Sequence, residues 1–239
     1  MCGLAGMALI YNANDRYNML ASLGYGIDTR GNNAAGYVSY RYDGDMTFSR
    51  KRGSWRSANK EFMDGAANGD MCFMHSRAPG YNDPVTDAHP FPITRNGKVV
   101  LIGAHNGNIN DAWESAKAHG RKITVDSMEL FELIADRDLD SLHNLHGWGI
   151  AEWVETDKPR EIRLARLSEN AELVAAELTN GGFAWASTWH ILSSALQFSN
   201  LKVKKQIDVS EIGRVYLVSD KGIHPTDETG IRMAGYGHF

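Results

Sequence analysis

The chain begins with "MCGLAG" at residues 1–6, so one of its two cysteines, Cys2, directly follows the initiator methionine. The methionine is generally removed when the next residue is small, and Cys2 would then carry a free α-amine and a thiol. An α-amine with a pKa of about 7.7–8.0 can act as a general base, and a deprotonated thiol is a strong nucleophile. The stretch is compatible with a terminal nucleophile, but by itself it is better explained as the start of an ordinary buried strand, so the rest of the chain has to support the catalytic interpretation.

The composition limits the kinds of partner that we expect. The 239 residues are 43% apolar, enough for a core of ordinary size, and the formal net charge of −4 does not favour nucleic acid or anionic lipid. The longest strongly apolar run, "VVLIGA" at 99–104, is far shorter than the roughly 18 residues that span a membrane. We therefore expect small solutes as ligands, no nucleic-acid partner and no membrane partner.

The cysteine content predicts a reducing compartment. Two cysteines are too few for a disulfide scaffold, and no signal peptide precedes Cys2. We therefore predict a cytoplasmic protein in which Cys72 is a buried, reduced core thiol. We predict no metal and no cofactor, because the spacings of five histidines match no ligand motif. These are His75, His89, His105, His143 and His146.

The hydrophobic pattern predicts an α+β fold. Short apolar runs predict strands at 3–11, 35–42, 71–77, 98–104, 148–154, 161–167, 171–178, 182–187 and 214–219, the run at 171–178 being also compatible with a helix. Helical spacing predicts helices at about 14–24, 57–66, 109–118, 126–136 and 189–197. Grouped strands with helices between the groups favour two packed sheets flanked by helices. Nothing divides the chain, so we expect a single domain at 1–239.

Two loops are predicted as well. "DGD" at 43–45 lies between two strand-like runs and predicts a hairpin. The stretch 78–96 holds three of the six prolines and is predicted to be the longest irregular segment. A loop of that length inside a compact domain is usually functional.

Three segments carry candidate polar groups. "LIGAHNGNIND" at 101–111 predicts a buried strand, a tight Asn-Gly turn and a helix start. The Asn106 side-chain amide and the Gly107 N–H could then form an oxyanion hole, although an ordinary turn gives the same dipeptide. "MHSRAPG" at 74–80 ends a strand with Arg77, whose guanidinium can bind a carboxylate. Asp126 or Ser127 is expected to cap the next helix, where Asp126 could instead bind an ammonium group.

In order along the chain, these segments resemble the glutaminase domain of class II glutamine amidotransferases, in the N-terminal-nucleophile (Ntn) hydrolase superfamily. The family pattern combines an N-terminal Cys-Gly, an Arg-Gly motif, a strand ending in Thr/Ser-Arg, His-Pro, His-Asn-Gly and an Asp-containing helix start. The matching stretches are "CGLAG" at 2–6, "RGNNAAGY" at 30–37, "HSR" at 75–77, "AHPF" at 88–91, "AHNGNIND" at 104–111 and "DSMELFELI" at 126–134. Six motifs in the family's order make the resemblance specific.

The resemblance implies a four-layer α/β/β/α Ntn-hydrolase sandwich of two mainly antiparallel sheets flanked by helices. It implies that the Cys2 thiolate, with its own α-amine as base, hydrolyses the side-chain amide of L-glutamine through a thioester. The roles implied for the other residues are oxyanion stabilisation and substrate binding. Asn106 and Gly107 would stabilise the oxyanion. Arg77 would bind the glutamine α-carboxylate and Asp126 its α-ammonium, with His89 and Arg30 as supporting residues.

Three departures from the family pattern concern the substrate lid and its supports. Ala78 stands where the family has an aromatic residue, Asn33 where it has an acidic one, and Met128 where an acidic residue follows Asp-Ser. Tyr81 could replace the missing aromatic. These departures make glutamine specificity a weaker implication than the identity of the nucleophile.

The family usually joins the glutaminase to a synthase domain, and the sequence shows no such domain. We therefore expect a separate ammonia-accepting synthase partner. The alternatives are a stand-alone Ntn amidase or γ-glutamyl hydrolase on another small amide, and a catalytically faded glutamine-binding or interaction module. The sequence leaves open whether Met1 is removed, which the Cys2 amine requires.

Overall fold

The computed structural model describes residues 2–79 and 85–234. Its strands form two sheets, and all of the described strand pairs run antiparallel. The first sheet has the order β11 (Val203–Ile207), β9 (Val174–Leu178), β10 (Phe183–Ala186), β1 (Gly3–Ala8), β4 (Met71–Arg77), β2 (Ala34–Tyr40) and β3 (Met46–Arg52). The second has the order β13 (Gly222–Pro225), β12 (Val215–Ser219), β8 (Ile162–Arg166), β7 (Gly147–Glu155), β6 (Lys98–Ile109) and β5 (Phe91–Arg95).

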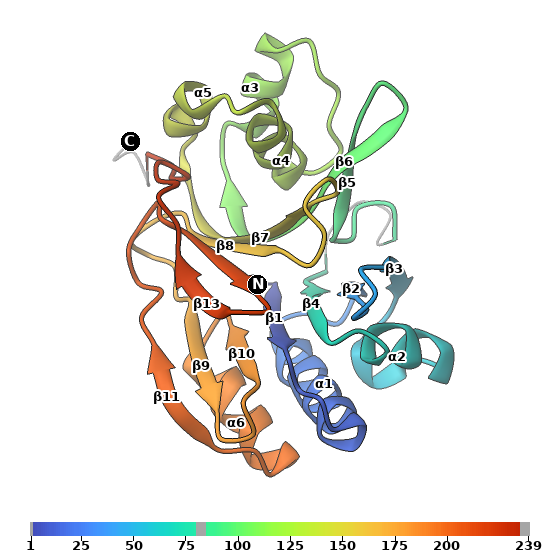
Figure 1. Ribbon diagram of the computed structural model, residues 1–239. Helices are drawn as coiled ribbons and strands as arrows, with labels where there is room; N and C mark the ends of the chain where they lie inside the picture. The colour runs from blue at the N-terminus through green and yellow to red at the C-terminus, as the bar shows by residue number, and fades with distance from the viewer. Residues whose placement is uncertain (1, 80–84, 235–239) are drawn as a thin grey trace.

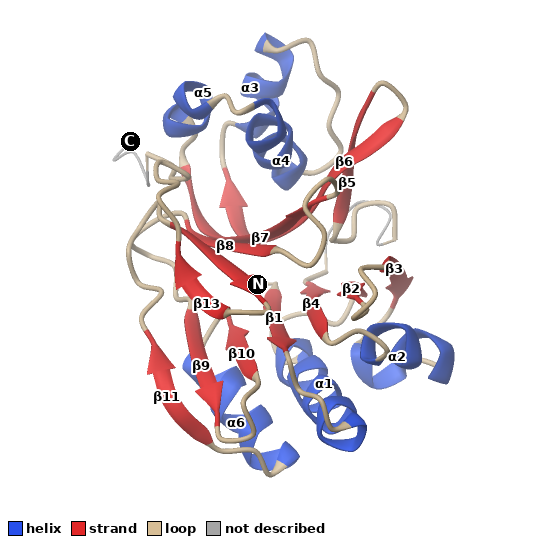
Figure 2. Cartoon of the chain, in the orientation of Figure 1, coloured by secondary structure: helices blue, strands red, loops and turns tan. Residues whose placement is uncertain are grey.

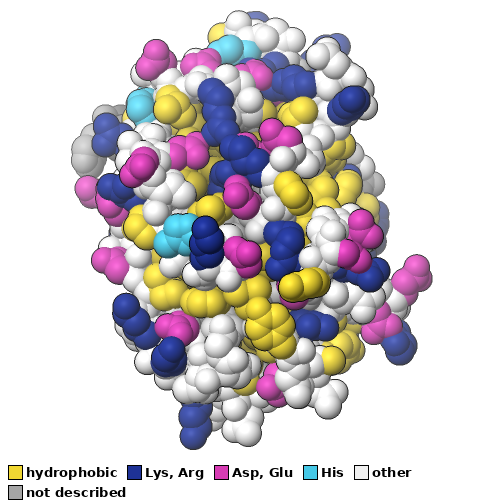
Figure 3. Space-filling view, in the orientation of Figure 1, with side chains coloured by type: hydrophobic (Ala, Val, Ile, Leu, Met, Phe, Trp, Pro, Cys, Tyr) yellow, Lys and Arg dark blue, Asp and Glu magenta, His cyan; other side chains and the backbone are white. Residues whose placement is uncertain are grey.

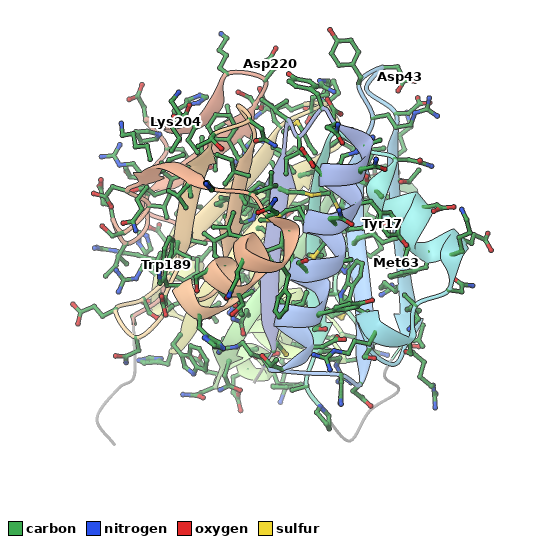
Figure 4. All side chains as sticks on the ribbon, turned by 90° about the horizontal axis from the view of Figure 1, so that it is seen from below. Tyr17, Asp43, Met63, Trp189, Lys204 and Asp220 are labelled. Carbon is green, nitrogen blue, oxygen red and sulfur yellow. The ribbon has the colours of Figure 1, made fainter. Side chains whose placement is uncertain are left out.

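Helices cover the outer face of each sheet, which gives four layers (Figures 1 and 2). The second sheet carries α3 (Ala112–Ala118), α4 (Asp126–Asp136) and α5 (Leu139–Asn144). The first sheet carries α1 (Ala13–Asp28), α2 (Lys60–Ala67), α6 (Trp189–Ser199) and the short 3-10 helix Trp55–Ser57. Figure 4 shows this helical face, with Tyr17 on α1, Met63 on α2 and Trp189 at the start of α6. The arrangement confirms the predicted α+β sandwich of two antiparallel sheets.

The central strand β1 is held on both sides by close packing. Every residue of its sequence, GLAGMA, is buried. A Cβ at Gly6 would lie 2.1 Å from the Trp185 ring, so glycine lets this indole cross the strand. Trp185 Nε1 in turn donates a 2.9 Å hydrogen bond to the buried Glu152 of the opposite sheet. This packing fixes the strand that carries Cys2 in the middle of the first sheet.

The sequence predicted nine strands and five helices that the structure contains, including 171–178 as a strand and the hairpin at 43–45 between β2 and β3. Cys72 is buried in the core as predicted. The prediction that 78–96 is wholly irregular was wrong, because β5 lies within it. Pro92 hides this strand in the sequence, and it is tolerated because β5 is an edge strand. The region around Tyr81 lies outside the described residues.

Four further elements were not predicted, namely β11, β13, α5 and the 3-10 helix Trp55–Ser57. The edge strand β11 reads VKKQI, and its central lysines are exposed, so it lacks an apolar alternation. The six-residue α5 is too short to show a period and begins at a side-chain cap, where Asp138 accepts from the N–H of Ser141.

Acidic and basic side chains are interspersed on the face shown in Figure 3. Within residues 2–79 and 85–234, no helix is both long and apolar enough to cross a membrane.

Candidate active site

Cys2 lies between the two neighbours of β1. On one side Gly3 pairs with Ser76 of β4, so Arg77 follows directly beside Cys2. On the other side the N–H of Ser187, just after β10, donates to Leu4 O at 2.8 Å. Arg30 Nε donates a 2.8 Å hydrogen bond to the carbonyl of Cys2. Cys2 is therefore fixed at the end of the central strand.

The Cys2 thiol is partly buried and close to groups of both charges. Burial raises its pKa, and the charge of Asp126 raises it further. The N–H of Ala78, which donates to Sγ at 3.4 Å, and the charge of Arg77 lower the pKa and only partly offset the burial. Because the thiol is protonated near neutral pH, it needs a base before it can act as a nucleophile.

Asn106 and Gly107 lie inside β6, opposite Ile150 and Gly149 of β7. The prediction of a tight Asn-Gly turn was therefore wrong. Gly107 allows β6 and β7 to approach each other closely, because a Cβ at this position would lie 1.9 Å from the carbonyl oxygen of Trp148. Asn106 is 4% exposed, and within the described part of the chain its Oδ1 makes no hydrogen bond. The amide is thus a buried polar group without a full set of partners.

Arg77 ends β4, as the sequence predicted, and is 9% exposed. Its Nη2 lies 3.9 Å from Oδ2 of the buried Asp87, and its Nη1 has no hydrogen-bond partner among the described residues. Asp87 is held by Thr124, whose hydroxyl donates to it at 2.8 Å. The guanidinium is therefore held by one carboxylate, with donor capacity left for a second anion.

Asp126 and Ser127 occupy the first turn of α4, and neither is its cap. The N-cap position is Val125, without a side-chain capping bond, so the prediction that Asp126 or Ser127 caps the helix was wrong. Asp126 instead accepts a 2.8 Å hydrogen bond from the N–H of Ile109, where β6 ends. This bond connects the carboxylate to the strand that carries Asn106. The carboxylate is therefore used there rather than for capping α4.

Ser127 connects Asp126 to the second sheet. Its hydroxyl donates to Asp126 Oδ1 at 3.3 Å, and it lies 2.9 Å from His105 Nδ1. With the hydroxyl proton directed at the carboxylate, the serine oxygen accepts from a His105 that is protonated on Nδ1. Burial lowers the pKa of His105, which keeps this imidazole neutral.

Two buried histidines, His75 and His89, lie close enough to Arg77 to feel its charge. The rings of His75 and His89 have centroids 4.1 Å apart, and Phe91 packs on His89 with centroids 4.4 Å apart. Burial lowers the pKa of His75 to about 3 and lowers that of His89 as well, an effect to which the Arg77 charge adds. His89 is thus a neutral ring beside the arginine, and its role in substrate binding stays a prediction. Among the described residues, no group of three or more His, Cys, Asp or Glu side chains is arranged to hold a metal ion.

An open cavity of about 490 Å³ adjoins the site. It is lined by Arg30, Asn106, Trp148, Ile150, Asn170, Ala171, Glu172, Ser187 and Thr188. Of these, the sequence singled out only Arg30 and Asn106. It also missed Asp87, although the proximity of this acid to His89 in the sequence was a usable signal. The remaining lining residues come from the second half of the chain, where no motif pointed to them.

No protein-family model matches the chain, and no curated protein matches it in sequence. Solved structures do resemble it. Glutamine phosphoribosylpyrophosphate (PRPP) amidotransferase from B. subtilis, complexed with ADP and GMP, superimposes with a TM-score of 0.70 at 20% identity, over 94% of this chain and 49% of that one. A structure described as the allosteric regulatory enzyme of purine biosynthesis gives 0.69 at 20% identity, over 94% and 48%.

A glutamine aminotransferase class-II domain protein from Silicibacter pomeroyi gives a TM-score of 0.52 at 14% identity, over 96% of this chain and 100% of that one. The chain thus spans about half the length of the first two proteins and the whole of the third. At these identities the likeness concerns the fold. It agrees with the four layers and with the fold that the motifs implied. The chain therefore has the Ntn-hydrolase fold of the class II glutamine amidotransferases.

Proposed function

We propose that this protein is a glutaminase of the class II glutamine amidotransferase type, with Cys2 as its nucleophile. The observation that carries the proposal is the placement of the Cys2 thiol within the fields of Arg77 and Asp126, two buried or partly buried groups of opposite charge. A zwitterionic amino acid is the ligand class that such a pair fits.

The proposed reaction begins with removal of Met1, which lies outside the described residues. The Cys2 α-amine then takes the thiol proton, and the thiolate attacks the side-chain carbonyl of glutamine. The C–N bond breaks, ammonia leaves with the proton, and a thioester remains. Water then cleaves the thioester to glutamate and the free thiol. The raised pKa of Cys2 is the reason why the neighbouring amine matters, because the thiol alone is not ionised.

Asn106 and Gly107 are the proposed donors to the oxyanion in both steps. Each well-placed donor contributes about 2.7–4 kcal/mol to such a transition state. The burial of Asn106 supports this role, since a buried donor keeps its orientation and acts in a medium of low dielectric. Arg30 is proposed to hold the Cys2 backbone, to which it already donates, and His89 to support Arg77.

Glutamine is proposed to bind with its α-carboxylate on Arg77 and its α-ammonium on Asp126. Arg77 has a donor without a partner among the described residues, and Asp126 keeps further lone pairs beyond its bond to Ile109. The two anchors fix both ends of a short flexible substrate, so the side-chain amide is delivered to Cys2 at a defined distance.

We also propose that residues 1–239 act as one domain that passes ammonia to a separate synthase partner in the cytoplasm, without a cofactor. The B. subtilis protein is an amidotransferase by name, and this chain spans about half of its length.

The test is a glutaminase assay on protein whose intact mass shows that it begins at Cys2. We expect release of glutamate and ammonia from glutamine, and none from Cys2→Ala or from a form that keeps Met1. Cys72→Ala is the matched control, since this thiol is fully buried and should leave turnover unchanged. Absence of turnover in the processed protein, both alone and in the presence of a lysate of its own source cells, would contradict the proposal.

A further inference from the structure

Cys2 has two flanks that differ in their residues. The β4 flank consists of Arg77, Asp87 and Asp126 and lies towards β4 and α4. The β10 flank is the 490 Å³ cavity, whose walls come from the ends of β10 and β7 and from the segment before β9. Because β1 pairs with β4 on one edge and with β10 on the other, the two flanks lie on opposite sides of Cys2 (Figure 1).

The strand order of the second sheet supports the same division into two flanks. In the second sheet β6 lies between β5 and β7, and Asn106 pairs with Ile150, which lines the cavity. Arg30 lines the cavity too and holds the carbonyl of Cys2. The cavity therefore begins at the proposed oxyanion donor and at the arginine that holds the Cys2 backbone.

The volume exceeds what the proposed reaction needs on this side. A leaving ammonia molecule is about the size of water, which occupies roughly 30 Å³ in the liquid. The cavity is more than ten times larger, at about 490 Å³. An amine of amino-acid size would fit in the cavity, next to Asn106 and Arg30, without any movement of the chain.

The geometry of an amide directs the leaving group to this flank. If the α-carbon of the substrate is held at Arg77 and Asp126, its side chain reaches Cys2 from the β4 flank. The carbonyl carbon is trigonal, and its oxygen points to Asn106. The remaining substituent, the nitrogen, then points away from the side chain, and the cavity that begins at Asn106 and Arg30 is the open space that can receive it.

The cavity lining combines apolar side chains with polar groups that are held in place. Glu172 accepts a 2.8 Å hydrogen bond from the N–H of Trp189, the residue labelled at the start of α6 in Figure 4. Thr188 caps the same helix by accepting from the N–H of Ile191. Ser187 is bonded to Leu4 of the central strand. These groups are held in place by backbone bonds, and Arg30 and Glu172 give the walls opposite charges.

We propose that the β10 flank is a leaving-group site, so that the enzyme also hydrolyses γ-glutamyl amides whose leaving amine is an amino acid. This inference rests on the proposed function and extends its substrate class. The leaving amino acid lies in the cavity with its polar groups towards Arg30, Glu172 and Thr188, and Trp148 covers its apolar part.

The chemistry balances as it does for glutamine. The Cys2 thiolate forms the C–S bond, the amide C–N bond breaks, and the nitrogen takes the proton that the α-amine had removed from the thiol. The amino acid then leaves the cavity, and water hydrolyses the thioester to glutamate and the thiol. No oxidant, reductant or metal takes part.

The experiment compares glutamine with γ-glutamyl-alanine on protein that begins at Cys2, and follows release of ammonia and of alanine. The peptide with the ordinary α-linkage, α-glutamyl-alanine, is the substrate control, because it lacks the free α-carboxylate that Arg77 binds. We expect turnover of the γ-linked peptide, with kcat/KM within about tenfold of glutamine or better, and none of the α-linked one.

The variant Asn170→Trp tests the place of the leaving group, since Asn170 is an exposed residue of the cavity wall and its replacement should not disturb the core. It should lower kcat/KM for γ-glutamyl-alanine about tenfold or more and that for glutamine less than about threefold. Gln197→Trp, at an exposed position on α6 outside the cavity lining, is the matched control and should change neither.

The outcomes separate the two proposals. Turnover of glutamine alone overturns the leaving-group site and keeps the glutaminase. Turnover of the γ-linked peptide alone keeps the leaving-group site and removes glutamine as the substrate. Equal losses for both substrates in Asn170→Trp overturn the assignment of the cavity, and no turnover of either substrate overturns both proposals.

Discussion

The two flanks of Cys2 are built on different principles. On the β4 flank the charged groups are buried or partly buried and already engaged, with Arg77 near Asp87 and Asp126 bonded to the end of β6. On the β10 flank polar and apolar groups line an open cavity. A pre-arranged charge removed from solvent gives orientation and specificity, whereas an open wall of mixed character accepts ligands of different size. The contrast favours a fixed glutamyl part and a variable leaving part in the substrate.

Removal of the charge on the β4 flank should have the largest effect. We expect Arg77→Ala to lower kcat/KM for glutamine about 100-fold or more, mainly through KM, because it removes a buried cation and leaves Asp87 unpaired. Steady-state kinetics with glutamine measure this. The exposed Arg56→Ala, on the far helical face, should change kcat/KM less than about twofold. A loss confined to kcat, with KM unchanged, would contradict the binding role of Arg77.

The boundary between the flanks should be the next most sensitive place. A Cβ at Gly107 would lie 1.9 Å from Trp148 O, so Gly107→Ala must push β6 and β7 apart. We expect a loss of about 1–3 kcal/mol in the free energy of unfolding, measured by urea denaturation, together with a fall in kcat as the oxyanion donors shift.

Gly97→Ala is the matched comparison for this variant. Gly97 has a φ of +75°, and no atom lies within 4 Å of the position that a Cβ would take there. Its replacement therefore costs backbone strain, about 1–2 kcal/mol, without moving the strands that carry the site. Stability should fall in both variants, and kcat only in Gly107→Ala. An unchanged kcat in Gly107→Ala would remove Gly107 from the proposed oxyanion hole.

Ser127 provides a smaller test of the pre-arrangement on the β4 flank. Ser127→Ala removes the hydroxyl that joins Asp126 to His105, so Asp126 loses one of its two orienting bonds. We expect kcat/KM for glutamine to fall about tenfold, as for a hydrogen bond to a charged group, with the loss in KM. Ser127→Thr keeps the hydroxyl and should recover most of the loss. If alanine and threonine behave alike, the serine does not position Asp126.

The sequence singled out Arg77 and Asp126 of the β4 flank, but only Arg30 and Asn106 of the residues that line the β10 flank, and the reason is physical. Cys2 and Arg77 lie at strand ends and Asp126 lies at a helix start, each in a short local motif, so their neighbours in sequence reveal them. The cavity is assembled from the segments at 148–150, 170–172 and 187–188, which meet only when the two sheets pack. No local pattern records that contact.

The same limit explains the two local errors within the site. Asn-Gly is typical of a turn, yet here Gly107 faces Gly149 across a strand pair, and the partner lies 42 residues away in the chain. An Asp-Ser pair before an amphipathic stretch is typical of a helix cap, yet here the Asp126 carboxylate accepts a hydrogen bond from the N–H of Ile109. In both places a tertiary partner decided the outcome, although the residues chosen as site candidates stayed the same.

The smallest effect that we expect is a change in the titration of the Cys2 thiol, which would show how the two charges of the β4 flank act on it. Burial raises the thiol pKa, Arg77 lowers it and Asp126 raises it. The rate of alkylation by iodoacetamide follows the thiolate, so its midpoint should lie above that of a free cysteine. Asp126→Asn should move the midpoint down and Arg77→Ala should move it up, because each variant removes one of the opposing charges. The buried Cys72 should not react in the folded protein. If both variants moved the midpoint in the same direction, the two groups could not act on Cys2 as opposite charges, and the pairing that supports a zwitterionic substrate would fail.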